Sequence, residues 1–394
     1  MRIVHTTLRY PPASGGVETY VQELVTRTRY ETGAAGVLQT SNPNRFDVRV
    51  LTSRLRTHGP MSELAPEQLL DDPMHVQRLH HAATPLVSYP RLQALKYYLG
   101  HHQPDIIHGH GFWYQPADVS ARYARRHRRP FVFNPYFYAH GPRQKLIWQL
   151  YRSTIGRATF AAADAVIVIS PFEQKLIESA GLPVNRFVLI PPGIDTAVFN
   201  QPRPNPFQAR GLAGEIALAV SRLAESKGLS SLLRALPSVL KKHPNLQLVI
   251  IGDDFGAKKK LQQQAVALGI TNYIHFWGHL EREQLLAAYQ HADIFIHPSY
   301  YEAFGITVAE AFAARTPVIA RNTSAIPFVA PPHTTSLLFN DDSELPETMT
   351  TLLSNATLRR TLGEQGHQHV KKNFSWEKSI ATLTSLYHEL YAQR

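Results

Sequence analysis

The chain has 394 residues, and its 41 lysines and arginines against 30 aspartates and glutamates give a formal net charge of +11. Apolar residues make up 44% and charged residues 18%, a balance that excludes a disordered or fibrous chain. Because there is no cysteine, disulfides, zinc–thiolate sites and cysteine nucleophiles are also excluded. At roughly 150 residues per domain, the length predicts two or three domains.

Charge and hydropathy restrict the location and the partners. The first residues, Met1–Thr6, lack the apolar run of a signal peptide, and no segment approaches the roughly 18 uninterrupted apolar residues of a membrane span. We therefore expect a cytoplasmic protein. The positive charge indicates phosphate among the partners, in nucleic acid, anionic lipid or metabolites. The arginines within Arg122–Arg129, here called the arginine cluster, would suit peripheral attachment to the inner face of a membrane, although a solvated helix face explains them equally well.

Short β-branched runs alternate with helix-like stretches along nearly the whole chain. The first series of expected strands is Arg2–Thr6, Val48–Thr52, Asp105–His110, Phe131–Asn134, Ala165–Ser170 and Val188–Pro191. The second series is Ile216–Ser221, Leu246–Gly252, Tyr273–Gly278, Ile294–His297 and Pro317–Arg321. Most runs are continuously apolar, which is typical of parallel strands covered on both faces. Amphipathic segments between them, such as Gly16–Arg27, Ser230–Lys242 and Arg282–His291, predict the crossover helices.

The two series are separated by the proline-spaced stretch Gln201–Pro206, which cannot be a central strand or a helix interior. We interpret it as a hinge between two α/β domains. The expected fold is two facing Rossmann-like domains, each a doubly wound parallel sheet, with an interdomain cleft. The expected bounds are 1–200 for the first domain, 201–372 for the second, and 373–394 for a C-terminal helix that packs back on the first.

The stretch Pro298–Ala311 predicts a strand–loop–helix turn with two carboxylates. Glu302 lies in the loop and Glu310 in the early turns of the helix that begins near Gly305. The amides of Phe304, Gly305, Ile306 and Thr307 would be free donors at the positive end of this helix. Two carboxylates beside an anion-binding helix end suit a diphosphate flanked by hydroxyl-rich groups. An exposed helix with two solvated glutamates remains the alternative.

Arg222 and Lys227 follow the strand Ile216–Ser221, at the same expected sheet edge. An arginine fork and a lysine point charge together suit an oxygen-rich diphosphate. Alone, this pair is weak evidence, because such residues in loops are mostly solvated. Combined with the acidic turn, it would form the second half of one site.

These motifs resemble the glycosyltransferases of family 4, which are retaining enzymes of the two-domain GT-B fold. The family's Glu-x7-Glu motif is matched by Glu302 and Glu310, and its Gly-Arg-Leu-x3-Lys-Gly segment by Arg222–Gly228. Further matches extend the resemblance over almost the whole chain: Gly15, Gly16, Pro191–Asp195, Phe276–Gly278, Tyr289, Ala292–Asp293, Pro298–Ser299, Pro317–Ala320 and Phe374–Trp376.

The resemblance implies roles for these residues. Arg222 and Lys227 would bind the diphosphate of a nucleotide-sugar donor, and Glu310 the ribose hydroxyls. Glu302 and the amides after it would hold the transferred sugar. The remaining donor contacts would be Gly252 and Phe276, Trp277 and Gly278 around the base, with Gly15 and Gly16 approaching from the first domain. The donor is a UDP- or GDP-sugar, no metal or other cofactor is expected, and the acceptor would be a lipid-linked or cell-envelope glycan intermediate.

The chain departs from the family pattern in three places. Ser221 stands where a glycine is usual, and Asn322–Pro327 replaces a loop that usually contains two adjacent glycines. Relatives often carry a histidine soon after the fourth strand, where this chain has Asn134–Gly141. Tyr136 would take the place of this sugar-contacting histidine, which leaves His140 as the candidate catalytic group of the first domain.

Two functions remain as alternatives to sugar transfer. A nucleotide-sugar epimerase or hydrolase would use the same fold, and a non-catalytic nucleic-acid binder would use the charge, although Glu302 and Glu310 would repel phosphate strands. His108 and His110 point to one face of their strand, but without a clear third ligand we expect a cleft-lining or hydrogen-bonded role, not a metal site. The segment Arg143–Arg152 mixes basic and apolar residues, which suits either a membrane surface or packing on its own domain.

Overall fold

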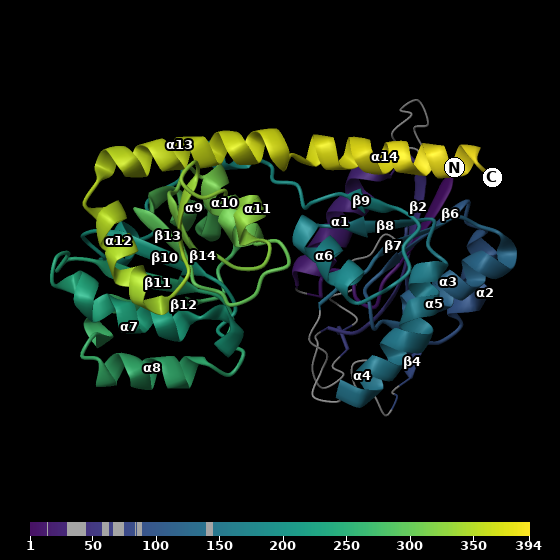
Figure 1. The fold of residues 1–394 in the computed structure, drawn as a ribbon, viewed down its shortest axis with the longest axis horizontal. Coiled ribbons are helices and arrows are strands. Elements are labelled where there is room, and N and C mark those ends of the chain that lie inside the picture. Colours follow the sequence, from purple (N-terminus) through teal and green to yellow (C-terminus); the bar gives the residue numbers. More distant parts are fainter. Residues whose placement is uncertain are drawn as a thin grey trace. The chain divides into compact units, whose positions relative to one another are not determined.

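The computed structural model describes residues 1–13, 15–29, 45–56, 63–65, 75–82, 84, 89–138 and 145–394. It divides into two compact units, drawn in Figure 1. Unit 1 comprises Met1–Pro191 and Glu377–Arg394, and unit 2 comprises Pro192–Trp376. The chain therefore passes from unit 1 to unit 2 after Pro191, before the boundary expected after residue 200.

The proline-spaced stretch Gln201–Pro206 consequently lies inside unit 2, not between the units as interpreted from the sequence. Its backbone is tied to its own unit by side chains. Gln290 donates to the carbonyl of Gln201 over 2.7 Å, and Arg203 donates to the carbonyl of Val198 over 2.9 Å. Prolines prevent regular structure in such a stretch without making it a hinge.

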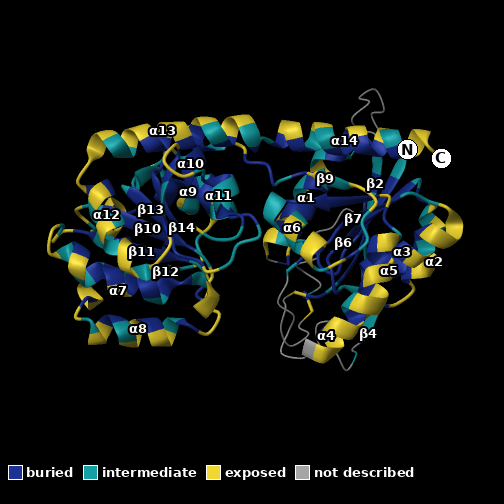
Figure 2. Cartoon of the chain, viewed as in Figure 1, coloured by how far each residue is buried: buried dark blue, intermediate teal, exposed yellow. Residues whose placement is uncertain are grey.

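Unit 1 is built on a seven-stranded parallel sheet in the order β3-β2-β1-β6-β7-β8-β9. The strands are β1 (Arg2–Thr6), β2 (Asp47–Ser53), β3 (Val76–Leu79), β6 (Ile106–His110), β7 (Phe131–Asn134), β8 (Ala165–Val168) and β9 (Phe187–Leu189). A small antiparallel pair, β4 (His81–Ala82) and β5 (Arg91–Leu92), stands apart from the sheet. The central strands are buried throughout, as the dark blue arrows in Figure 2 show, because helices cover both faces.

The helices of unit 1 are α1 (Gly16–Thr28), α2 (Leu95–His102), α3 (Gln115–His127), α4 (Lys145–Tyr151), α5 (Arg157–Ala161), α6 (Pro171–Ser179) and α14 (Trp376–Ala392), with a π-helical turn at Arg152–Gly156. From Glu377 onward, α14 packs on unit 1. Tyr387 is fully buried, with its hydroxyl 2.7 Å from His108 Nδ1, and Ser379 donates to the carbonyl of Pro191 over 2.8 Å. Residues nearly 280 positions apart in sequence thus share one core.

Unit 2 has a six-stranded parallel sheet in the order β12-β11-β10-β13-β14-β15. The strands are β10 (Ile216–Val220), β11 (Gln247–Ile251), β12 (Ile274–Gly278), β13 (Ile294–His297), β14 (Val318–Arg321) and β15 (Ser336–Phe339). The chain adds strands outward from β10 in one direction and then from β13 in the other. This is the doubly wound order, whose ligands bind where the direction reverses, beyond the carboxyl ends of β10 and β13.

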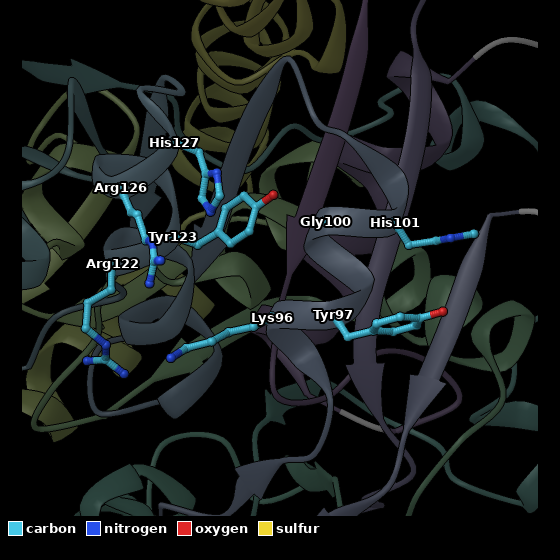
Figure 3. A pocket seen from close by; sticks show the side chains of 8 residues that line it. All are labelled: Lys96, Tyr97, Gly100, His101, Arg122, Tyr123, Arg126 and His127. Carbon is cyan, nitrogen blue, oxygen red and sulfur yellow. The ribbon is translucent and has the colours of Figure 1, made fainter.

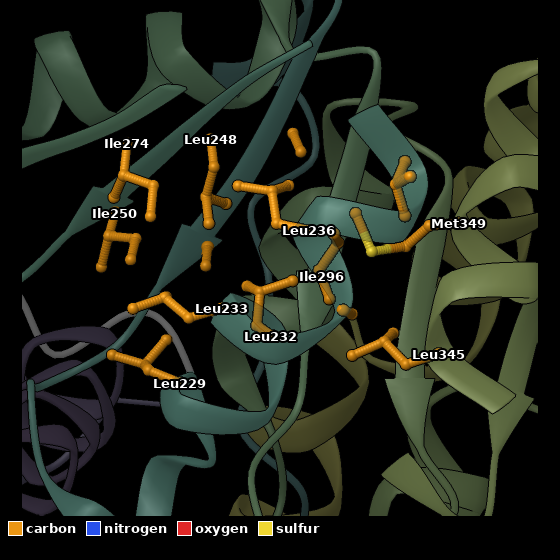
Figure 4. Packing of buried hydrophobic residues seen from close by; sticks show 14 of the residues in the cluster. Leu229, Leu232, Leu233, Leu236, Leu248, Ile250, Ile274, Ile296, Leu345 and Met349 are labelled. Carbon is orange, nitrogen blue, oxygen red and sulfur yellow. The ribbon is translucent and has the colours of Figure 1, made fainter. Parts of the chain in front are cut away.

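The helices of unit 2 are α7 (Leu229–Leu240), α8 (Lys258–Ala267), α9 (Arg282–His291), α10 (Ile306–Ala313), α11 (Ile326–Val329), α12 (Leu345–Leu353) and α13 (Ala356–Asn373). Short 3-10 turns lie at Val198–Asn200, Gln208–Arg210, Glu225–Lys227, Thr271–Tyr273 and Asp342–Glu344. In Figure 4, leucines of α7 pack against Leu248 and Ile250 of β11 and Ile296 of β13, with Met349 of α12 closing the cluster. This packing fixes the strand ends that carry the two motifs.

The structure confirms the predicted α/β fold of two Rossmann-like domains, and every expected strand is present to within two residues of its predicted ends. The sequence missed β3 and β15, one edge strand of each sheet, and the short pair β4 and β5, whereas the edge strands β9 and β12 were predicted. β3 mixes polar with apolar residues and is mostly half-buried, so it lacks the continuous apolar run used for prediction. The apolar run of β15 is only three residues long. Among the described residues, no helix combines the length and apolar character needed to cross a bilayer.

Candidate functional site at the switch point of unit 2

The loops after β10 and β13 meet at the point where the strand order of unit 2 reverses. The amide of Tyr300 donates to the carbonyl of Ser226 over 3.0 Å. Gly228 has a φ of +65°, and a Cβ at this position would lie 2.1 Å from the carbonyl oxygen of Pro298. The glycine after Lys227 is therefore required for the close approach of the two loops, which brings both sequence motifs to one place.

Lys227 and Glu302, predicted from separate motifs, form an ion pair at this junction. The Lys227 ammonium lies 2.5 Å from Glu302 Oε1. Both side chains are largely buried, with exposed fractions of 15% and 14%. His297, the last residue of β13, places its Nε2 3.1 Å from the same oxygen. Burial alone would raise the pKa of Glu302, but the bonds from His297 and Lys227 lower it to about 2. The carboxylate is therefore ionised at neutral pH.

The turn after Glu302 leads into the N-terminus of α10. Gly305 has a φ of +98°, and a Cβ there would lie 2.9 Å from Ile326 Cδ1. None of the described residues accepts a hydrogen bond from the amides of Phe304, Gly305, Ile306 or Thr307. The loop at Asn322–Pro327, which departs from the family pattern, supports this turn, because the Ala325 amide donates to the carbonyl of Glu302 over 3.2 Å. The first turn of α10 thus offers the free donors that the sequence predicted.

Glu310 lies one turn into α10 in a different environment. The hydroxyl of Tyr289 donates to Glu310 Oε2 over 3.0 Å, and the Arg282 guanidinium lies 3.9 Å from Oε1. Burial raises the pKa of Glu310 above its ordinary value, although the Arg282 charge and the Tyr289 bond oppose this shift. Glu310 Oε2 therefore accepts one hydrogen bond, from the neutral hydroxyl of Tyr289, and can accept more from the hydroxyl groups of a ligand.

Arg222 lies two residues beyond the end of β10, in the loop that also carries Lys227. Its guanidinium lies 4.9 Å from the ring centroid of Phe255, and no hydrogen bond joins it to Glu302 or Glu310 among the described contacts. Gly252 packs against the backbone that precedes Arg222, since a Cβ at this glycine would lie 2.0 Å from the carbonyl oxygen of Ser221. The exposed Arg222 and Phe255 thus form a cationic and aromatic surface beside the strand ends.

The predicted base-flanking residues lie on β12. Gly278 accepts a hydrogen bond from the Gly252 amide over 2.8 Å, which ties the ends of β11 and β12 together. The ring of Trp277 is covered by the Arg210 guanidinium at 4.2 Å and by Phe207 at 5.3 Å between centroids. Phe276 packs against the apolar core of unit 2. The side chains of Phe276 and Trp277 therefore pack within unit 2. The backbone at Gly278 contacts Gly252, at the end of β11.

The remaining predicted residues lie in unit 1. Gly15 and Gly16 stand at the start of α1, next to a buried ion pair in which Arg9 donates to Glu18 over 2.8 Å. His140 lies outside the described residues. Tyr136 has a φ of +48°, and its hydroxyl lies 3.0 Å from His110 Nδ1. The hydroxyl of Tyr136 thus belongs to a cluster of histidines within unit 1.

This cluster supplies the third histidine that the sequence did not reveal. His5 on β1 is paired in register with His108 on β6, and its Nδ1 lies 2.9 Å from His110 Nε2. The three rings are the one group of potential metal ligands found among the described residues. Hydrogen bonds to Tyr387, Asn134 and Tyr136 occupy the other ring nitrogens. Burial lowers the pKa of His108 to about 3, so the cluster is a neutral hydrogen-bonded network.

Several residues around the acidic turn had no predicted role, although Tyr289 and Ser299 matched the family pattern. His297 was placed at a strand end without a role, although a polar residue at the carboxyl end of a central parallel strand is itself a signal. Tyr289 and Arg282 of α9 reach Glu310 from another element, which spacing along the chain does not reveal. Ser299 is 1% exposed, and its hydroxyl has no partner among the described residues.

Both halves of the chain match models of glycosyltransferase families. Residues 14–198 match the family model described as Glycosyltransferase Family 4, and residues 206–369 match that described as Glycosyl transferases group 1. A D-inositol 3-phosphate glycosyltransferase of Corynebacterium jeikeium is 35% identical over 243 residues, which cover 58% of this chain and 58% of that protein. The chain thus spans a little over half the length of this relative.

Two further proteins match nearly end to end. A GDP-mannose-dependent alpha-(1-6)-phosphatidylinositol monomannoside mannosyltransferase of Mycobacterium tuberculosis is 25% identical over 406 residues, with 97% of each chain covered. The solved structure of HepE from Anabaena, in complex with UDP and glucose, superposes with a TM-score of 0.76 over 100% of both chains at 18% identity.

Proposed function

Because the chain belongs to family 4 of the glycosyltransferases, we propose that it transfers a sugar from a nucleotide-diphosphate donor to an acceptor hydroxyl, with retention at the anomeric carbon. The observation that carries this proposal is the meeting of Lys227 and Glu302 beside the free amides of α10. A cation, a helix N-terminus and carboxylates at one strand edge match a ligand with an anionic centre and hydroxyl-rich ends.

In this proposal, the diphosphate binds at the N-terminus of α10. Lys227 supplies a point charge, Arg222 a guanidinium fork, and the amides of Gly305 to Thr307 supply hydrogen bonds. Glu310 accepts from the ribose hydroxyls, and Glu302 from the transferred sugar. Lys227 can serve the phosphates while Glu302 stays ionised, because His297 also stabilises the Glu302 carboxylate.

Cleavage of the sugar–phosphate bond builds negative charge on the leaving diphosphate and positive charge on the sugar ring. Lys227, Arg222 and the α10 amides stabilise the leaving group, and interactions that strengthen in the transition state lower the barrier. The acceptor hydroxyl attacks from the leaving-group face and gives its proton to a phosphate oxygen. Because side chains supply the positive charge, we expect activity to persist when divalent cations are chelated.

The nucleotide is tested most directly by calorimetry with UDP and GDP. The relatives support both, since the Mycobacterium protein is named for GDP-mannose and the Anabaena structure holds UDP. We expect one of them to bind, and Lys227→Ala to weaken binding by about tenfold or more, as loss of a charged hydrogen bond predicts. Lys241→Ala, an exposed lysine elsewhere in unit 2, is the control. Failure of both nucleotides to bind would contradict the proposal.

Product analysis separates transfer from the related reactions of the same fold. A UDP- or GDP-sugar is incubated with and without glycan or lipid-linked acceptors, and the products are resolved by mass spectrometry. Transfer requires a glycosylated acceptor with the α or β configuration of the donor preserved. Release of free sugar at the same rate without acceptor would instead indicate a hydrolase.

The proposal extends to a lipid-linked acceptor at an anionic membrane surface. The Mycobacterium relative is named for a phosphatidylinositol mannoside. In this chain, α3 exposes Arg122, Arg125 and Arg126 of the arginine cluster, while α4 exposes 79% of Leu146 and 63% of Leu150. Exposed leucines and exposed arginines in the same unit suit a contact with anionic headgroups.

Vesicle sedimentation tests this extension. We expect the protein to pellet at low salt with vesicles of phosphatidylglycerol and phosphatidylcholine, and to stay in solution with phosphatidylcholine alone. The double substitution Leu146→Ser, Leu150→Ser should weaken pelleting without changing nucleotide binding. Equal pelleting with both kinds of vesicle would contradict an electrostatic membrane contact.

A further inference from the structure

A cavity of about 650 Å³ lies between α2 and α3 of unit 1, and Figure 3 shows its walls. Each helix contributes four residues: Lys96, Tyr97, Gly100 and His101 from α2, and Arg122, Tyr123, Arg126 and His127 from α3. The volume falls within the range of roughly 300–1,000 Å³ that is usual for small-molecule sites. The cavity belongs wholly to unit 1, whereas the proposed donor site belongs to unit 2.

The cavity is lined by three permanent cations and no carboxylate. Arg122 and Arg126 are four residues apart, so they project from the same face of α3. In Figure 3, Lys96 extends from α2 toward the side on which these arginines project. None of the three forms an ion pair or hydrogen bond with another described residue. The buried Asp118 interacts electrostatically with Arg122 but does not line the cavity. Like charges gathered at one surface are unfavourable, and a bound anion would reduce this cost.

Aromatic rings complete the walls. Tyr123 stacks on His127 with 4.1 Å between ring centroids and an interplanar angle of 25°. Tyr97 stacks on His101 at 6.2 Å and is 67% exposed. Gly100 also lines the cavity, and a Cβ there would make only an ordinary contact, 3.8 Å from the Tyr123 hydroxyl, so a larger side chain can be placed at this position. The rings offer a flat apolar surface and hydroxyl groups to the uncharged part of a ligand.

A second cavity, of about 330 Å³, lies on the other side of α3 and shares Arg122. It is lined by Arg122 and Arg125 together with alanines, Ile155 and two threonines. Two cations among mostly small or apolar groups make it a poorer anion site than the α2–α3 cavity. The convergence of charge is therefore specific to the gap between α2 and α3.

We propose that the α2–α3 cavity binds the phosphate group of a small phosphate ester. Lys96, Arg122 and Arg126 hold the phosphate oxygens, with arginine forks giving paired hydrogen bonds, and the tyrosines contact the alcohol part of the ester. The same chemistry is offered by a soluble phosphomonoester and by the headgroup of an anionic lipid. This site does not depend on the donor site of unit 2.

The experiment uses the full chain and two probes. Glycerol 3-phosphate is titrated by calorimetry, with glycerol as the uncharged comparison, and vesicles of phosphatidylglycerol and phosphatidylcholine are used for sedimentation. Binding of glycerol 3-phosphate indicates a soluble ester, and binding of the vesicles alone indicates a lipid headgroup. Either result supports the site if the cavity variants abolish it, and binding of neither probe overturns the proposal.

Two variants distinguish a built cavity from diffuse surface charge. The triple substitution Lys96→Ala, Arg122→Ala, Arg126→Ala should weaken binding at least about tenfold. A charge-matched control, Lys241→Ala, Lys242→Ala, Arg360→Ala, removes three exposed cations from unit 2 and should leave binding unchanged. Gly100→Leu keeps every charge but fills the cavity, and it should also abolish binding.

Retention of binding in Gly100→Leu, or equal loss in the charge-matched control, would overturn the proposal, since both would indicate attraction by net charge. Unchanged melting temperatures and unchanged UDP or GDP binding in the cavity variants show that both units remain folded. A failure of the donor proposal would appear instead as absent nucleotide binding in the unsubstituted protein. The two proposals therefore fail in different measurements.

Discussion

Glu302 is the residue whose protonation is most directly tied to the geometry of the candidate site. Its pKa of about 2 lies below the ordinary value near 4.5, because His297 and Lys227 outweigh the effect of burial. The folded state therefore binds the proton more weakly than the unfolded state does. The stability that ionised Glu302 contributes is complete above pH 4.5 and is lost as the pH falls toward 2.

We expect Glu302→Gln to lower the free energy of unfolding at neutral pH by up to about 3 kcal/mol and to flatten its decline in acid. Urea unfolding of the variant and the unsubstituted protein at several pH values between 2 and 7 measures this. Glu281→Gln, an exposed glutamate on a neighbouring loop, is the control. Parallel pH curves for the unsubstituted protein and Glu302→Gln would contradict the ion-pair interpretation.

Glu310 is expected to respond in the opposite way. Burial raises its pKa, so its ionised form is disfavoured by the fold. Glu310→Gln keeps an oxygen for the Tyr289 hydroxyl and removes the buried charge, so stability at neutral pH should stay the same or increase. Nucleotide affinity should fall by on the order of 1.5–3 kcal/mol if the carboxylate binds ribose hydroxyls. Calorimetry and thermal unfolding separate the two effects, and unchanged affinity would contradict the ribose assignment.

At the scale of elements, the site depends on two loops that are held together by backbone contacts. Gly228 has a positive φ and lies against Pro298, so an added methyl group meets both backbone strain and a carbonyl oxygen. Gly211 provides a matched comparison, because its φ of +72° is similar but no atom lies within 4 Å of the position that a Cβ would occupy. The two glycines thus differ only in what surrounds them.

We expect Gly211→Ala to cost about 1–2 kcal/mol, the usual penalty for a left-handed alanine. Gly228→Ala should cost more and should also weaken nucleotide binding, because separating the loops moves Lys227 away from Glu302. Thermal unfolding and calorimetry on both variants measure this. Equal effects of the two substitutions would show that the close approach at Pro298 has no role in the site.

The sequence predicted the central strands, which are buried on both faces, and the edge strands β9 and β12, but it missed the edge strands β3 and β15. The runs at β10 and β13 could be located because continuous apolar stretches leave few alternatives. The edge strand β3 mixes valine and leucine with glutamine and arginine, so its sequence resembles that of a loop. The roles of Tyr289 and Arg282 depend on how α9 packs beside α10, which no spacing along the chain specifies.

At the scale of the whole molecule, the chain completes unit 1 with its last helix. The buried face of α14 includes Leu383, Leu386 and Tyr387, with exposures of 2% or less. Deletion of Glu377–Arg394 should therefore expose the unit 1 core and its histidine cluster. The facing arrangement of the two domains across a cleft stays a prediction.

We expect this deletion to abolish cooperative unfolding of unit 1 while unit 2 still binds its nucleotide. Removal of only Gln393 and Arg394, which takes away the ion pair with Asp105 but none of the buried face, is the control. Tyr387→Phe is a milder test that removes the hydrogen bond to His108 and should cost about 1–3 kcal/mol. Differential scanning calorimetry with and without nucleotide distinguishes the transitions of the two units. An unchanged unit 1 transition in the deletion variant would contradict this account.

The sequence by itself determined the alternation of strands and helices, the acidic turn at Glu302 and Glu310, and the basic segment at Lys227. These features are local, because apolar periodicity and strand ends depend on residues that are neighbours in the sequence. Only the tertiary structure decided that His5 joins His108 and His110, that Tyr387 completes their network, and that α2 and α3 line a cationic cavity. Such groupings arise from packing between distant segments, and the energies that select them depend on neighbours that the linear sequence does not identify.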